Sequence, residues 1–87
     1  MRKKEMLVQL ENLAESLGIS VRYENLGVHH GGLCKLFGKQ FLFVNKALSL
    51  EAKIELFINE LKNFNLDNKF VIPELREQLT KEADNKQ

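Results

Sequence analysis

Two imidazoles and one thiol lie within six residues of the sequence, at His29, His30 and Cys34. Histidine nitrogen and cysteine sulfur are ligands that zinc prefers, and Glu24 would add an oxygen ligand. A structural zinc site needs four ligands, however, and adjacent side chains of an extended chain point in opposite directions. We therefore keep a zinc site here as the alternative and expect a solvent-exposed pair of histidines with no metal.

Cys34 also suggests a nucleophile, with His29 or His30 as the base that produces the thiolate. Acyl transfer would further need an orienting group and oxyanion donors around a substrate, for which a small domain has little depth. We expect Cys34 to be a small buried residue on a strand instead. Gly31 and Gly32 precede a strand and not a helix, so they do not predict a phosphate-binding loop.

The remaining candidates are cationic side chains. Arg76, near the start of a predicted helix, would suit a carboxylate or phosphate group of a partner. Arg2, Lys3 and Lys4 form a basic cluster that, together with Arg22, would favour nucleic acid. The formal net charge is only +1 and no aromatic residues are interleaved with the cluster, so we do not expect a nucleic-acid partner.

The elements that must position these residues can be predicted from hydrophobic periodicity. Spacings of three and four predict helices, and alternation predicts strands. The segment 25–32 has neither period and contains several glycines, so it predicts a loop, where function would most easily lie. The predicted helices are 3–17, 50–64 and 73–83, and the predicted strands are 19–24, 33–37 and 40–44.

The last two strands form a predicted hairpin, with Gly38 and Lys39 as its two turn residues. In this register Phe41 and Phe43 share one face of the final strand. Its other face is apolar too, so we expect 40–44 to be central or covered.

Helix boundaries follow from three residues. Gly18 closes the first helix, Ser49 caps the second, and Pro73 occupies the first position of the third. Ala83 extends the apolar seam of the third helix, and 84–87 is predicted to be a frayed tail. The fold class is therefore α+β: one domain, 1–87, with a three-stranded, mostly antiparallel sheet packed by two main helices and a C-terminal helix.

Composition excludes several classes of protein. The chain has 87 residues, of which 44% are hydrophobic and 29% charged, as in a globular domain. It has one cysteine and no secretion-like opening, so we expect a cytoplasmic protein without disulfides. Its longest apolar runs are far below the roughly 20 residues that span a bilayer, so we expect no membrane segment.

The chain resembles two groups of proteins, and each resemblance depends on particular residues. The chain is similar to a family of small bacterial proteins of unknown function, which implies a compact bacterial cytoplasmic protein and no established activity. The likeness covers nearly the whole chain and depends on Leu17-Gly18-Ile19-x-Val21-Arg22-Tyr23-Glu24, Gly31-Gly32-Leu33-Cys34, Gly38-Lys39 and Pro73-Glu74-Leu75-Arg76-Glu77.

The second resemblance concerns residues 5–64. Their succession of helix, strand, hairpin and Val44-Asn45-x-x-Leu48-Ser49 resembles the opening of the ImmA/IrrE-type metallopeptidases. The zinc-binding helix of that family carries His-Glu-x-x-His, in which two histidines hold zinc and the glutamate is the general base. This chain has Asn59-Glu60-Leu61-Lys62-Asn63 there. Asparagine is a poor zinc ligand, so the resemblance implies the topology without the peptidase chemistry.

We therefore expect a non-enzymatic interaction module that binds a protein partner or a second copy of itself, without membrane or nucleic acid. Its binding residues would be His29, His30, Gly31, Gly32, Cys34 and Arg76. The alternative is a small metal- or thiol-dependent enzyme or sensor in which His29, His30 and Cys34 hold zinc or activate the thiol.

Overall fold

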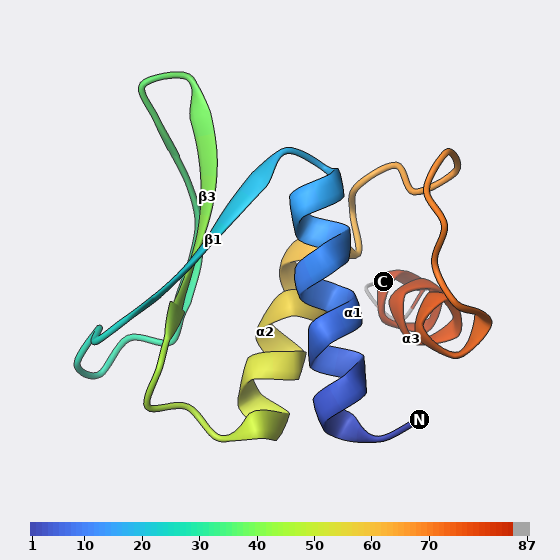
Figure 1. The fold of residues 1–87 in the computed structure, drawn as a ribbon, viewed down its shortest axis with the longest axis horizontal. Coiled ribbons are helices and arrows are strands. Elements are labelled where there is room, and N and C mark those ends of the chain that lie inside the picture. Colours follow the sequence, from blue (N-terminus) through green and yellow to red (C-terminus); the bar gives the residue numbers. More distant parts are fainter. Residues whose placement is uncertain (85–87) are drawn as a thin grey trace.

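The computed structural model describes residues 1–84. Its elements are α1 (Lys3–Ser16), β1 (Ile19–Glu24), β2 (Gly31–Leu36), β3 (Lys39–Asn45), α2 (Leu50–Leu61) and α3 (Pro73–Asp84). The predicted α+β class is confirmed. The sheet, the pair α1 and α2, and α3 form three successive layers (Figure 1).

The sheet has the order β1-β3-β2, so β3 is central as predicted. β2 runs antiparallel to β3, whereas β1 runs parallel to it. The sheet is therefore mixed, with one antiparallel and one parallel pair of strands. Two reversals of the chain, at 25–30 and at the hairpin, bring β3 back in the direction of β1, and β3 lies between the two earlier strands. A strand with apolar residues on both faces is best placed in the middle.

Local sequence accounts for the helix boundaries. The turn after α1 contains Gly18 at φ +81°, a left-handed conformation that suits glycine. Ser49 caps α2, since its Oγ accepts a hydrogen bond from the Ala52 N–H at 3.1 Å. α3 begins at Pro73. These three predictions are confirmed. Asp84, placed in the predicted tail, belongs to α3, whereas the Ala83 side chain and residues 85–87 lie outside the described part.

The hairpin differs from the prediction by one residue. Leu36 pairs with Lys39, so the turn residues are Phe37 and Gly38, at φ +52° and +78°. The prediction of Gly38 and Lys39 as turn residues was wrong, because Lys39 belongs to β3 and pairs with Leu36. A two-residue turn with positive φ at both positions matches the twist of a hairpin, but it holds phenylalanine in a left-handed conformation.

The core lies on both sides of the α1/α2 layer. Towards the sheet, the buried side chains come from β1, β3 and the two helices. Towards α3, they come from the helices and the segment 66–71. The fully buried large residues are Phe57, Leu10, Ile19, Leu42, Leu61, Leu75, Leu79 and Val44. No helix within residues 1–84 has the length and apolar character needed to cross a membrane.

Tyr23 joins β1 to both neighbouring helices. Its hydroxyl donates a hydrogen bond to Glu11 on α1, and the Lys53 ammonium of α2 lies 5.6 Å from its ring centroid. Burial, and then the hydrogen bond and negative charge of Glu11, raise the pKa of the Tyr23 phenol above its usual 10. The neutral phenol is therefore part of the folded state.

Tyr23 is the only tyrosine and the chain has no tryptophan, so its ionisation can be followed by ultraviolet absorbance. We expect a midpoint above pH 10 in the folded protein. Because the folded pKa exceeds the unfolded one, this contribution to stability is complete below pH 10 and is lost at higher pH. Glu11→Gln should lower the midpoint and Glu15→Gln should not. An ordinary midpoint in the wild type would contradict the assignment.

Candidate functional site

The loop between β1 and β2 is held by a buried carboxamide. Asn45, the last residue of β3, is only 4% exposed. Its Nδ2 donates to the carbonyl oxygens of Gly27 at 3.0 Å and His29 at 2.8 Å. Its Oδ1 accepts from the Ala47 N–H at 3.0 Å. One side chain therefore satisfies backbone groups of two segments that flank the sheet.

The side chains of the two histidines in this loop are exposed to solvent. His29 and His30 are both exposed, as expected, and their backbone carbonyls bind Asn45. Among residues 1–84, no three side chains of His, Cys, Asp or Glu are placed to hold a metal ion together. The structure therefore does not gather His29, His30 and Cys34 into one cluster.

Gly31 and Gly32 belong to β2 and not to the predicted loop. At Gly31, with φ +130°, an added Cβ would overlap the carbonyl oxygen of Phe43 on β3. Glycine is therefore needed here for the close approach of two backbones. This is a packing role, and it explains why glycine stands at Gly31 without invoking a ligand.

Cys34 is exposed, so the prediction of a buried thiol was wrong. It pairs with Phe41 in the register, and both residues project from the face opposite the α1/α2 layer. A strand residue is buried only where an element covers its face, and Figure 1 shows α1 and α2 on the other side of the sheet. The alternation alone could not reveal which face would stay open.

Most of the cationic candidates have partners within the chain. Arg76 donates from Nη2 to the carbonyls of Leu66 at 3.2 Å and Lys69 at 3.0 Å, so it ties the α2–α3 connection to α3. Lys3 binds Glu51 at 3.0 Å and holds the pKa of that exposed carboxyl below its usual value. Arg22 lies 3.4 Å from Glu24.

Glu60, which stands where the peptidase resemblance would place a general base, has a structural contact here. Its Oε1 accepts a hydrogen bond from the Leu33 N–H of β2 at 3.4 Å. The side chain therefore reaches from α2 to the outer edge of the sheet.

The residues that the site prediction missed are on the open face of the sheet, by which we mean the side away from α1 and α2. The rings of Phe41 and Phe43 stack there with centroids 5.9 Å apart. The sequence predicted that Phe41 and Phe43 share one face of their strand, but it did not predict that no helix within residues 1–84 covers this face. The open face consists of Ser20, Arg22, Glu24, Gly32, Cys34, Leu36, Lys39, Phe41 and Phe43.

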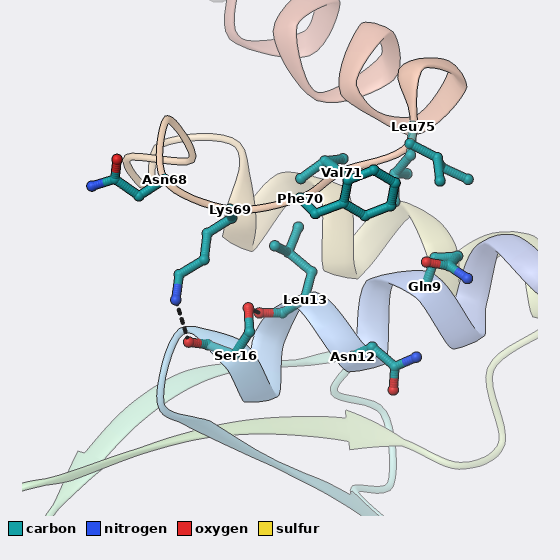
Figure 2. A pocket seen from close by; sticks show the side chains of 10 residues that line it. Gln9, Asn12, Leu13, Ser16, Asn68, Lys69, Phe70, Val71 and Leu75 are labelled. Carbon is teal, nitrogen blue, oxygen red and sulfur yellow. Dashed lines mark hydrogen bonds between the residues drawn. The ribbon is translucent and has the colours of Figure 1, made fainter.

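A cavity of about 300 Å³ lies between α1, the segment 68–72 and the start of α3. Leu13, Val71 and Leu75 face this space, and the Lys69 ammonium crosses its end to the Ser16 carbonyl at 2.8 Å (Figure 2). The other polar lining side chains are neutral, so the cavity offers no acid–base pair. Sequence periodicity did not predict it, because it arises from how α3 packs.

The Asn45 contacts predict a matched pair of stability effects. Asn45→Asp should destabilise the protein by about 2 kcal/mol at pH 8, because a carboxylate would face two carbonyl oxygens. The environment raises the pKa of the new carboxyl group, so the loss should grow as pH rises from about 4. Asn25→Asp keeps its acceptor role towards the Gly27 N–H and should change little. Urea unfolding at both pH values measures this, and equal losses for the two variants would contradict it.

Comparisons with known proteins do not assign the chain to a family. No protein-family model, no curated protein and no solved structure matches the chain. What the site does is therefore inferred from the exposure, contacts and charges of the described residues.

Proposed function

We propose that the protein is a non-enzymatic protein-interaction module, and that it associates with a second copy of itself through the open face and the tip of the hairpin. The observation that carries this proposal is Phe37. The ring is fully exposed and its backbone is in the left-handed region, at φ +52°.

Phe37 costs the isolated protein stability in two ways. A left-handed conformation of a bulky residue costs about 1–3 kcal/mol, and glycine or asparagine would adopt it with less strain. The exposed ring also forgoes the burial that normally stabilises an aromatic side chain. An aromatic residue of this kind gains its favourable contacts when a partner buries it, and such residues are typical anchors of protein interfaces.

The open face continues this apolar surface from the hairpin tip into the sheet. Leu36 is exposed, and Phe41 and Phe43 are only half-buried although they lie on the central strand. Contiguous apolar surface of this kind marks interaction sites in soluble proteins. The ring pair therefore supports docking of a second apolar surface here.

The charges on the open face favour a second copy as the partner. Arg22 and Glu24 lie on the same face of β1, two residues apart. A copy related by a two-fold axis can place its glutamate beside this arginine and its arginine beside this glutamate. An isologous interface requires this kind of self-complementarity.

The size of the face sets the expected affinity. Three strands at about 4.8 Å and six residues at about 3.3 Å give a footprint of about 14 Å by 20 Å. This is smaller than the roughly 800 Å² per partner of a standard interface, so the dimer should be weak and depend on concentration.

Phe37→Asn should stabilise folding by about 1 kcal/mol and weaken self-association at least tenfold. Urea unfolding and sedimentation equilibrium measure the two effects. Cys34 adds a native reporter, because it lies on the open face and should react with a thiol reagent more slowly as dimer forms. Phe70→Asn is the matched control, since Phe70 is 86% exposed but lies outside this surface.

Two results would overturn the proposal. One is a wild-type protein that stays monomeric up to about 1 mM, with Cys34 reactivity independent of concentration. The other is a dimer that Phe37→Asn and Phe70→Asn weaken equally. Binding of single-stranded RNA, abolished by Phe43→Ser, would assign the ring pair to base stacking instead.

A further inference from the structure

We infer that the free edge of β1 is a second docking site, which accepts an extended polypeptide segment of another protein as a fourth strand. This goes beyond self-association through the open face, because it rests on backbone groups at the edge of the sheet.

The direction of the backbone groups in β1 follows from one hydrogen bond. The Glu24 carbonyl accepts from the Lys46 N–H at 2.9 Å, and Glu24 is the register partner of Asn45. In a parallel ladder, a residue that bonds to the neighbouring strand directs both its N–H and its C=O towards it, and the next residue directs both away. Arg22 therefore faces β3 like Glu24, whereas Val21 and Tyr23 direct their N–H and C=O groups outwards.

These outward groups are unpaired within the described residues. Outside the ladder, no hydrogen bond of residues 1–84 reaches the backbone N–H or C=O of Ile19, Val21 or Tyr23. The opposite edge differs, because the outward N–H of Leu33 on β2 is taken by the Glu60 side chain of α2. The sheet thus has one edge partly closed by a helix and one edge open.

β1 has few of the devices that usually protect an edge strand, although Arg22 and Glu24 are charged. Its register with β3 is continuous from Ile19 to Glu24, without a bulge, and its sequence Ile-Ser-Val-Arg-Tyr-Glu contains neither proline nor lysine. Edge strands with neither a bulge nor a proline keep their outward backbone groups free to pair with an added strand. An extended peptide would gain main-chain hydrogen bonds from Ile19, Val21 and Tyr23, as in strand addition generally.

The position of α1 decides which occupant fits. α1 packs on β1, to which the Tyr23–Glu11 hydrogen bond also joins it, so it stands over the edge of the sheet (Figure 1). Paired strands lie about 4.8 Å apart, whereas packed helices need about 8–10 Å. Two copies paired through β1 would force their α1 helices together. A strand that carries no helix above it avoids this clash.

The side chains beside the edge indicate the chemistry of the peptide. The hydrogen bond between Glu11 and Tyr23 shows which face of α1 lies next to β1. The same face of the helix carries Val8 and Glu15, which stand three and four residues from Glu11. Val8 is half-exposed, and Glu15 is exposed. Side chains of an added strand that point towards α1 would therefore be apolar beside Val8 and basic beside Glu15. The ligand class is an extended peptide whose side chains on the side towards α1, which stand at every second position, include an apolar and a basic residue.

Phage display of random eight-residue peptides on the purified protein tests the inference. We expect enriched, synthesised peptides with this alternation to bind at micromolar concentration and to slow amide exchange of Val21 and Tyr23. Val21→Pro removes an outward N–H together with a partly buried side chain that packs on the core, and it should weaken binding at least tenfold. Leu33→Pro is the control at the β2 edge: it removes the N–H that Glu60 binds and should leave peptide binding unchanged. If Val21→Pro does not fold, Glu15→Lys should weaken the same peptides instead.

Three results would overturn the inference: a library from which no peptide is enriched, peptides that bind Val21→Pro and Glu15→Lys as tightly as the wild type, or slow amide exchange of Val21 and Tyr23 in the free monomer. The two docking sites can be separated in the same experiments. Phe37→Asn should leave peptide binding unchanged, and Val21→Pro should leave self-association unchanged.

Discussion

The arrangement of the sheet depends on the buried side chain of Asn45. By binding the Gly27 and His29 carbonyls, it fixes the reversal that carries the chain from β1 to β2. By accepting from the Ala47 N–H, it also fixes the chain where β3 ends. A carboxamide suits this position because it donates and accepts at once, which neither a carboxylate nor an aliphatic side chain can do. These bonds hold the loop 25–30 against the end of β3, the strand that lies between β1 and β2.

The sequence predicts elements well where a single residue decides the geometry. Ser49, Gly18 and Pro73 each act within one turn of the chain, so their effects could be derived locally. The parallel pairing of β1 with β3 could not be derived locally, because it depends on the path of the loop 25–30 between β1 and β2. The hairpin turn was misplaced by one residue for a related reason: the register between β2 and β3 involves all the paired residues of both strands and not the turn residues alone.

The candidate site residues were predicted from their chemical types, and the structure shows that their positions do not bring them together. His29, His30 and Cys34 are close in sequence, but they could act together only if their side chains met at one point. Asn45 holds the loop by its backbone carbonyls, and the three side chains do not form a cluster. The exposed Cys34 and the ring pair of β3 share a face whose openness depends on the packing of distant helices. Arg76 illustrates the same limit, since its partners are backbone carbonyls that no pattern of charges can predict.

The connection between α2 and α3 packs Leu66 and Val71 into the core, and two cations that bind carbonyl oxygens hold it further. Lys69 reaches Ser16, and Arg76 reaches Leu66 and Lys69. Among the packed elements, α3 contacts α2 and lies outside the layer that covers the sheet. Such a peripheral segment opens at a lower free energy than the whole domain. We therefore expect α3 and the segment before it to open more readily than the sheet with α1 and α2, and such an opening would expose Leu75 and Leu79.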